Sequence, residues 1–406
     1  MLDIKKLSFE EKLVFITSIS LMLPYYVGAT VLILNFIYIV KSQKLDSLIV
    51  NSEENKWLMG FILYSFVVSI IFQNYLGLLA TFGILVFFVF FIYNTRYLSQ
   101  KLVESILTTM ILISSVWFLN TIFKAAFVFF LSGEGIDGFL KFISFNRADS
   151  VFFNPNYYGM VGDFMFLIGL KRYIDNHEKR IKFLYGTYLV IAAMAVYLSG
   201  SRGAQIALIF GALALSINLK DYKTTNLLIL GITVGLGLVI ITGNMANTRL
   251  ATVTQDYGLR RSIWGSSIRF INKHMLIGAG PLGIQAVYDL IRSREVIHSH
   301  NILLDFLVNY GLTGMVLIYP FAQAIIDRIN KIKNSEQFGL IFALTVTILI
   351  HGIVDVTIFW HQTAFIYFLL VFSAAGSPVA EFSTIKVSEL KPVVRASASG
   401  NFRNIG

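Results

Sequence analysis

The feature that most constrains this chain is a series of long, nearly uninterrupted apolar runs. Most are about 15 to 30 residues long, which brackets the roughly 20 residues that a helix needs to cross the hydrocarbon core of a bilayer. Membrane β-barrels show short alternating segments instead. The runs therefore predict an all-α integral membrane protein with about twelve transmembrane helices, near residues 13–24, 26–40, 57–72, 75–93, 102–131, 151–170, 183–199, 203–219, 225–242, 301–322, 338–356 and 358–376.

Composition excludes other classes of protein. Only 14% of the 406 residues are charged, against roughly 25% in soluble domains. The net charge of +10 comes mostly from Lys and Arg in short connections, where basic residues set membrane topology, so we expect no nucleic-acid partner. The chain has no cysteine, which excludes disulfides and thiolate catalysis. The basic N-terminus lacks a small-residue cleavage site and is expected to lead into a first span.

The distribution of basic residues predicts the orientation. Both termini are placed in the cytoplasm, which puts 22 of the 33 Lys and Arg residues inside, as short loops require. Lysines flank the pair of runs that meets at Pro24 on both sides, so a hairpin is favoured there over one long helix. The predicted organisation is a membrane domain over 1–376, with an extracytoplasmic loop over 243–300, and a flexible cytoplasmic tail over 377–406.

The extracytoplasmic loop is basic, although this side is normally poor in Lys and Arg. Residues 243–300 hold seven basic residues and three acidic ones. An anionic ligand explains this concentration. Arg202, in the short connection Gly200–Ala204, lies on the same side, and its forked donors suit phosphate oxygens. A tight turn with a snorkelling arginine is the structural alternative.

Two adjacent arginines, Arg260 and Arg261, lie in the loop just before a pattern of apolar residues. From Ser262 to Lys273 this pattern predicts an amphipathic helix along the membrane surface. Adjacent residues on a helix point about 100° apart, so only one of the two arginines is expected to face any given site. The alternative is contact of both with lipid headgroups.

His298, His300 and Asn301 open the tenth run. A histidine is a suitable base near neutral pH, since its unperturbed pKa is about 6.5. A metal is not expected, because the sequence shows no third ligand and the neighbouring charge is positive. Helix capping is the structural alternative for this motif.

Other polar residues lie at the ends of runs or within them. Asn156 follows Asn154 and Pro155, a proline suited to the start of a helix. Ionisable residues at membrane depth are costly and face the interior of a bundle, in a functional or a structural role; here they are Asp163, His351 and Asp355. The segment Gly278–Gly283 has the spacing of a dinucleotide fingerprint but follows no predicted strand. It predicts a tight turn.

The order of these motifs resembles the O-antigen ligase/polymerase superfamily. The order is Asn-Pro-Asn, then Gly-Ser-Arg-Gly-Ala, then Arg-Arg-Ser-Ile-Trp with Gly-Ala-Gly-Pro-Leu-Gly, then His-Ser-His-Asn with Asn-Tyr-Gly-Leu-Thr-Gly, over about residues 150 to 320. The resemblance implies a GT-C-like architecture and glycosyl transfer from an undecaprenyl-diphosphate-linked glycan, without metal or other cofactor, at the extracytoplasmic face of a bacterial inner (plasma) membrane.

The resemblance also implies roles for particular residues. Arg202 and Arg260 match the two arginines that act on the diphosphate, with Arg261 a close second to Arg260. His300 matches the essential histidine. The expected catalytic residues are therefore His300, Arg260 and Arg202, and the expected substrate-binding residues are Arg261, His298, Asn156 and Asn301.

The expected partners are the lipid-linked donor, a glycan or lipid acceptor and membrane lipids. A polymerase is slightly favoured over a ligase. A transporter of lipid-linked glycans is the main rival function, but transporters place their binding groups near the bilayer midplane, whereas these motifs gather at one face. A receptor or scaffold, the third hypothesis, needs neither Arg202 nor His300.

Overall fold

The computed structural model describes residues 4–42, 45, 49, 52–133, 135, 146–242, 253–288 and 296–374. Over these residues it is all-helical, with fourteen α-helices and no strand. Each of the twelve predicted apolar runs coincides with one helix. These helices are α1 (Phe9–Ser20), α2 (Tyr25–Lys41), α4 (Glu53–Ile71), α5 (Tyr75–Asn94), α6 (Gln100–Ser132), α8 (Pro155–Asp175), α9 (Lys179–Leu198), α10 (Arg202–Asn218), α11 (Tyr222–Thr242), α14 (Ile302–Lys331), α15 (Glu336–Gly352) and α16 (His361–Ala374).

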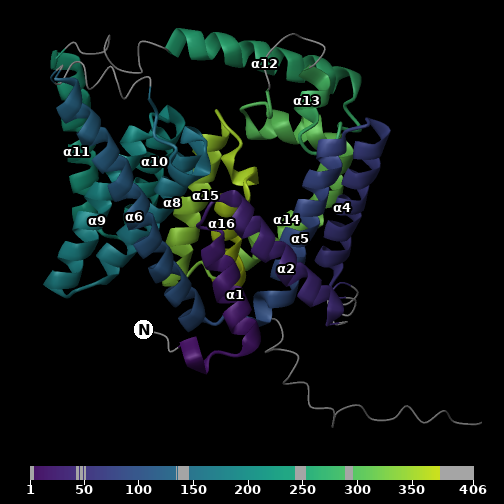
Figure 1. Ribbon diagram of the computed structural model, residues 1–406, viewed down its shortest axis with the longest axis horizontal. Helices are drawn as coiled ribbons and strands as arrows, with labels where there is room; N and C mark the ends of the chain where they lie inside the picture. Colours follow the sequence, from purple (N-terminus) through teal and green to yellow (C-terminus); the bar gives the residue numbers. More distant parts are fainter. Residues whose placement is uncertain are drawn as a thin grey trace, which may run out of the picture.

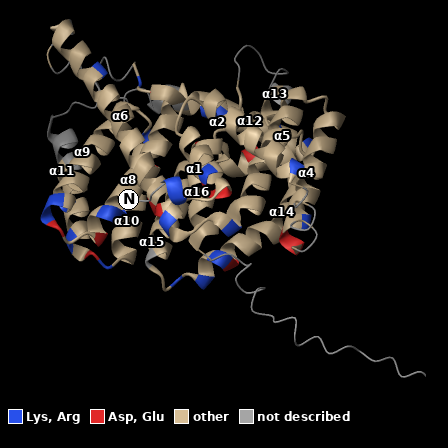
Figure 2. Ribbon diagram, turned by 60° about the horizontal axis from the view of Figure 1, so that its bottom comes forward, with Lys and Arg blue, Asp and Glu red and all other residues tan. Residues whose placement is uncertain are grey.

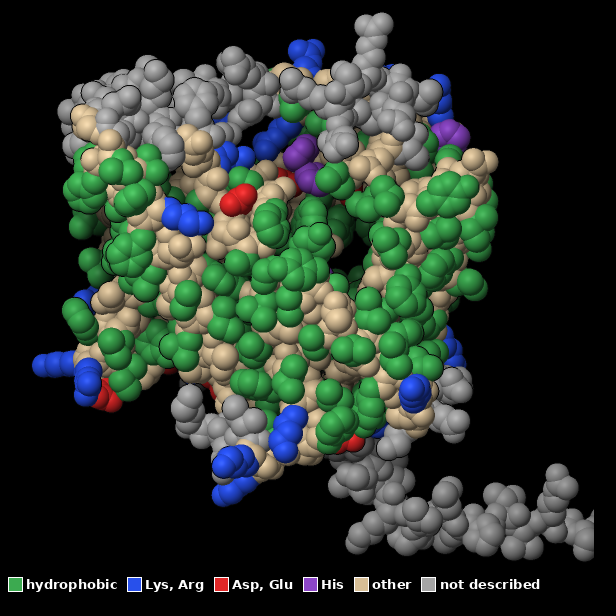
Figure 3. Space-filling model, viewed as in Figure 1, with side chains coloured by type: hydrophobic (Ala, Val, Ile, Leu, Met, Phe, Trp, Pro, Cys, Tyr) green, Lys and Arg blue, Asp and Glu red, His purple; other side chains and the backbone are tan. Residues whose placement is uncertain are grey.

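The helices form a bundle suited to a bilayer. Five of them, α4, α5 with the turn that follows it, α6, α9 and α14, are long and apolar enough to cross a membrane. Hydrophobic side chains cover the middle of the face drawn in Figure 3, and charged side chains gather toward its top and bottom. Figure 2 turns the end near the N-terminus forward and shows Lys and Arg on several helix ends there. The chain is therefore an integral membrane protein.

The first two runs form the hairpin that the flanking lysines predict. Helix α1 ends at Ser20 and α2 begins at Tyr25, after Pro24. The two helices pack together, and Asn35 Nδ2 donates to Thr17 Oγ1 at 3.2 Å. The chain also approaches closely at Gly28, where an added Cβ would lie 3.0 Å from the Cα of Leu21, the residue after α1.

Two further helices belong to the long basic segment. Helix α12 (Val253–Lys273) lies across the top of the bundle, and the short α13 (Gly283–Tyr288) lies beside its end (Figure 1). The helix predicted from Ser262 is confirmed and begins earlier. Its Ile263 is buried, whereas Ile268 is exposed. Phe270 and Ile271 pack against the apolar cluster beneath α12.

A break in α14 fixes the segment that follows α12. Gly311 has φ 59° and ψ −167°, so the helical hydrogen-bond ladder is interrupted there. The freed carbonyls of Val308 and Asn309 accept from Ala279 N and Gly280 N, both at 2.8 Å. The turn predicted over 278–283 is therefore confirmed, and it inserts into α14. Buried polar backbone needs such partners at membrane depth.

The predicted tail over 377–406 lies outside the described residues, as do parts of the predicted loop, 243–252 and 289–295. The described part of that loop contains α12, which lies above the ends of α8, α10 and α15 (Figure 1).

Candidate functional site

One cavity brings together residues from five separate parts of the sequence. It has a volume of about 230 Å³ and is lined by Arg147, Asn156, Gly200, Ser201, Arg202, Gly203, Leu259, Arg260, His300, His351, Val354 and Asp355. Four of the seven predicted site residues are among them: Asn156, Arg202, Arg260 and His300. The motifs therefore converge although up to 144 positions separate them.

Small residues and helix caps build the floor of this cavity. Asn154 caps α8 by accepting from Asn156 N (2.9 Å) and Tyr157 N (3.2 Å), which confirms the predicted helix start. Ser201 caps α10, so Arg202 is its first residue. Gly203 has no room for a side chain, since an added Cβ would lie 2.8 Å from Val354 Cγ2. Two helix N-termini, and with them positive dipole ends, face the cavity.

The cavity is lined by three arginines. Arg202 and Arg260 are the predicted pair, and Arg147, from the segment before α8, is a third that the sequence analysis missed. All three are half-buried. With the two helix N-termini, this arrangement favours an anion, and several forked donors suit a diphosphate.

The two adjacent arginines of α12 diverge as helical geometry requires. Arg260 is half-buried and lines the cavity, whereas Arg261 is exposed and does not. The expectation that only one of them faces the site is confirmed. Which of the two acts on substrate stays a prediction.

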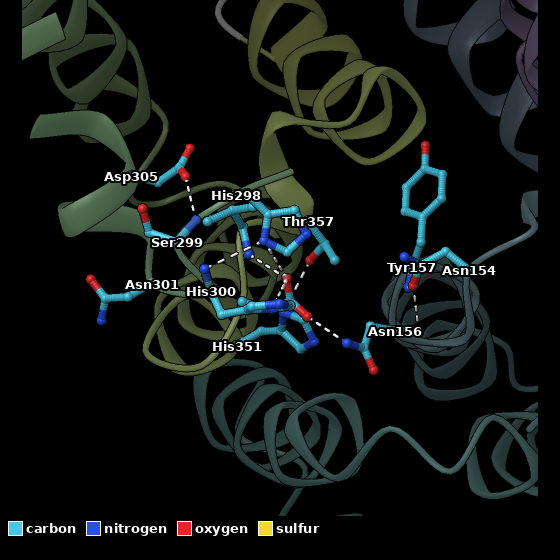
Figure 4. Close-up of polar contacts among 12 residues, drawn as sticks. Asn154, Asn156, Tyr157, His298, Ser299, His300, Asn301, Asp305, His351 and Thr357 are labelled. Atoms are coloured by element: carbon cyan, nitrogen blue, oxygen red, sulfur yellow. Dashed lines mark hydrogen bonds and ion pairs between the residues drawn. The ribbon is translucent and has the colours of Figure 1, made fainter. Parts of the chain in front are cut away.

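Asp355 is the centre of the polar network and was not among the predicted site residues. Figure 4 shows its partners Asn156, His298 and His300. Its side chain is 3% exposed. Oδ2 accepts from Asn156 Nδ2 at 2.6 Å, and Oδ1 lies 3.6 Å from His300 Nδ1 and 3.7 Å from His298 Nδ1. The amide N–H of Asn156 is thus its closest polar partner, and the two imidazole rings lie on the other side of the carboxyl group.

Asn156 and Arg147 support this carboxylate from below. The Oδ1 atom of Asn156 accepts from Arg147 Nη2, and Arg147 Nε donates to Ser199 O at 2.9 Å. The chain of contacts runs from Ser199, just after α9, through Arg147 and Asn156 to Asp355. Asn156, predicted to bind substrate, is therefore also a member of the network that fixes Asp355.

The histidine pair has an unusual backbone. His300 has φ 50°, the left-handed region that residues other than glycine rarely adopt. Its N–H donates to His298 Nδ1 at 3.3 Å, which requires that nitrogen to be unprotonated. Strained backbone of this kind is retained where the surrounding structure enforces it. Here the cap of α14 and the contact of His300 Nδ1 with Asp355 Oδ1 hold the pair.

Asn301 has a structural role in this arrangement. Its Oδ1 accepts from Leu303 N and Leu304 N as the cap of α14, and its Nδ2 donates to Ile353 O at 3.0 Å. It lies on the far side of the histidines from Asn156 (Figure 4) and does not line the cavity. Its predicted contact with substrate stays a prediction.

The expectation that the histidines lack a third potential metal ligand is wrong. The ligand atoms of His298, His300 and Asp355 lie within 4.8 Å of one another. Asp355 is 55 positions after His300 in the sequence, so spacing alone does not reveal it. The three arginines that line the same cavity oppose a cation.

Asp163 is a second buried carboxyl, in α8, and it does not line the cavity. Within the described part of the chain neither of its oxygens has a hydrogen-bond partner.

Burial of His298 makes a testable contribution to stability. Its side chain is 13% exposed. Burial lowers its pKa to about 4, and the charges of His300 and Arg260 act in the same direction, against Asp355. In the unfolded chain His298 has its ordinary pKa of about 6.5, so as pH falls it is protonated there before it is protonated in the folded protein. The free energy of unfolding therefore decreases between about pH 6.5 and pH 4, by roughly 3 kcal/mol at most.

We therefore expect the apparent melting temperature of the purified protein to fall between pH 7 and pH 4. In His298→Gln, which cannot take up this proton, the decrease should be clearly smaller. An equally steep decrease in the variant would contradict a neutral, buried His298.

The geometry agrees with a comparison with known families. A family model described as O-antigen ligase matches residues 187–319, which include Arg202, both adjacent arginines of α12 and the histidine pair. A search of the curated proteins finds no significant match. Asn156 and Asp355 lie outside the matched region and join the site only through the fold. Residues 187–319 are thus similar to the O-antigen ligase family, a membrane glycosyltransferase type.

Proposed function

We propose that the cavity transfers or polymerises an undecaprenyl-diphosphate-linked oligosaccharide onto a glycan acceptor at the extracytoplasmic face of the bacterial inner membrane. The observation that carries the proposal is the convergence of Arg202 and Arg260 on a cavity that also contains His300. About twelve helices of a GT-C-like architecture span the bilayer, with residues 243–300 on the outside. Both termini then lie in the cytoplasm, as the charge distribution predicts.

In the proposed mechanism the arginines bind the donor. The guanidinium groups of Arg202 and Arg260 neutralise the diphosphate and stabilise the charge that builds on it as the bond to the first sugar breaks. Arg147 orients Asn156 and adds positive charge to the same cavity. Arg261 and His298 border the site, where they contact the glycan or the headgroup region.

His300 accepts the proton of the attacking hydroxyl. Its Nδ1 faces Asp355 Oδ1 at 3.6 Å, which leaves Nε2 as the basic nitrogen, as in other histidine–carboxylate pairs. Asp355 then orients the ring and stabilises its protonated form. The leaving diphosphate needs no metal once its charge is balanced by arginine.

Purified protein supplied with lipid-linked oligosaccharide tests the proposal. We expect longer glycans, or glycans joined to an added acceptor, in detergent solution where no leaflet exists. A transporter makes no new bond under these conditions, so unchanged oligosaccharide together with relocation in liposomes would favour the rival function. The product also distinguishes a polymerase, which we favour, from a ligase.

The role of Asp355 as a positioning residue predicts a particular kinetic pattern. Asp355→Asn keeps the shape but removes the charge, so we expect kcat to fall by about 10²-fold or more while KM for the donor changes by less than about threefold. Asp163→Asn, at the buried carboxyl outside the cavity, is the matched control and should keep kcat. A rise in KM as large as the fall in kcat would assign Asp355 to donor binding instead.

A further inference from the structure

A second polar pocket lies at the other end of the bundle. It has a volume of about 400 Å³ and is lined by Thr95, Arg96, Leu98, Ser99, Gln100, Gln337, Ser373 and Ala374; we call it the Arg96 pocket. Helix α15 links it to the candidate active site, since Gln337 lies near the start of this helix and His351 near its end. Fourteen residues of helix separate the two ends by about 21 Å. In the proposed orientation the Arg96 pocket opens at the cytoplasmic face.

Arg96 is held in place by aromatic rings. Its Cζ lies 4.4 Å from the ring centre of Tyr93 and 5.1 Å from that of Tyr97. Tyr93 is 1% exposed, so it provides a fixed surface. Such stacking positions a guanidinium while leaving its in-plane N–H groups free to donate.

The guanidinium has donors without acceptors. Within the described residues, Nε and Nη2 of Arg96 are buried and have no hydrogen-bond partner. Buried donors are rarely left unsatisfied, because each costs the free energy of its lost hydration. Nε and Nη2 form one edge of the fork, the edge that binds two oxygens of one oxyanion. Because both atoms are buried, the guanidinium must turn toward the pocket before this edge can bind an anion there.

The surroundings also favour an anion. The pocket is formed at the N-terminal ends of two helices, α6 and α15, whose dipoles are positive there. The side-chain amides of Gln100 and Gln337 line it and offer further donors. Among the described residues that line it, none is acidic. Basic pockets between membrane helices at the cytoplasmic face bind anionic headgroups.

We propose that the Arg96 pocket binds a phosphate group, with two of its oxygens on Nε and Nη2 of Arg96 once the guanidinium has turned toward the pocket. The group belongs to a lipid headgroup of the facing leaflet or to free inorganic phosphate, and both present the same tetrahedral oxyanion. The site is separate from the candidate active site and its occupancy does not depend on glycan transfer.

Binding to the purified full-length protein in detergent tests this proposal. The probes are phosphatidylglycerol, a neutral phosphate-free glycolipid with the same acyl chains, and inorganic phosphate. Native mass spectrometry of the wild type should show retention of phosphatidylglycerol over the glycolipid. Arg96→Gln should weaken this binding by about tenfold or more, whereas Lys101→Gln, which removes an exposed charge just outside the pocket, should not. Competition by inorganic phosphate, with the same dependence on Arg96, would identify free phosphate as an alternative occupant.

Arg96→Lys guards against a folding defect, which the melting temperature without ligand reveals. Lysine keeps the positive charge but lacks the planar fork of arginine, so we expect the affinity for phosphatidylglycerol to fall by about threefold or more. Equal retention of the two lipids by the wild type would overturn the proposal, and so would unchanged affinity in the folded Arg96 variants. Failure of the glycan-transfer assay would leave this result unaffected, because no glycan donor is present.

Discussion

Replacing His300 by glutamine is expected to lower the rate of glycan transfer by about 10²–10⁴-fold, the range over which a positioned general base contributes. The imidazole lines the cavity, and its Nδ1 faces the buried Asp355 carboxylate. Glutamine retains polarity and approximate size but cannot accept the proton of the acceptor hydroxyl. The measurement is the initial rate of glycan transfer by purified protein at saturating donor.

The chain offers a matched control in His274. This histidine stacks on Phe270 at the end of α12 (ring centres 4.7 Å apart) and does not line the cavity. His274→Gln should keep the rate within about threefold, as surface changes away from a site usually do. A normal rate in His300→Gln, in protein that is correctly folded, would remove His300 from the role of base.

The second large effect is expected at the adjacent arginines of α12. Arg260→Ala should reduce kcat/KM by about 10²–10³-fold, because one preformed donor to a developing negative charge contributes on that scale. Arg261→Ala should reduce kcat/KM by less than about tenfold, since an exposed charge at the rim acts mainly by attracting the anionic donor. The pair is a demanding comparison because the two changes are chemically identical and one position apart.

Arg260→Lys adds a test of geometry. Lysine keeps the charge but not the planar fork, so its activity should lie between those of the wild type and Arg260→Ala. Equal decreases in kcat/KM for Arg260→Ala and Arg261→Ala would contradict the conclusion that only Arg260 faces the cavity. A larger loss at Arg261 would place the donor on the outer side of α12.

Much of the fold follows directly from the sequence. Apolar runs near the length of a membrane crossing locate twelve helices, and local chemistry fixes several of their ends. Asn154 with Pro155 starts α8, and Ser201 starts α10. The hairpin at Pro24 follows from the lysines on both of its flanks. Such signals are local, and they survive folding because they depend on neighbours within one helical turn.

The break in α14 illustrates what the sequence leaves open. Gly311 marks a flexible position, but the insertion of residues 275–280 into the helix depends on backbone partners more than 25 positions away. Long-range hydrogen bonds of this kind have no periodic signature. The same reason explains why the position of α12 above the bundle was not predicted in detail.

In the candidate site, too, some residues can be predicted from the sequence and others are placed only by long-range contacts. Arg202, Arg260 and His300 stand out because charge is costly in an apolar chain. The sequence marks Asp355 only as an ionisable residue at membrane depth, and it gives no signal for Arg147. Asn156 contacts both Arg147 and Asp355, and Asp355 also contacts the histidine pair. Neither partnership can be deduced from spacing, since the fold alone brings α8 and the end of α15 together.

Transfer in oriented proteoliposomes tests the central claim most directly, because it measures new glycosidic bonds and their side together. Protein is inserted with the α12 end outward, and the lipid-linked donor is supplied in either the outer or the inner leaflet alone. We expect glycans to lengthen, or to join the acceptor, only with donor in the outer leaflet, and the product to be lost in Arg260→Ala. Donor that moves between leaflets without forming a new bond, or product formed only from the inner leaflet, would contradict the account.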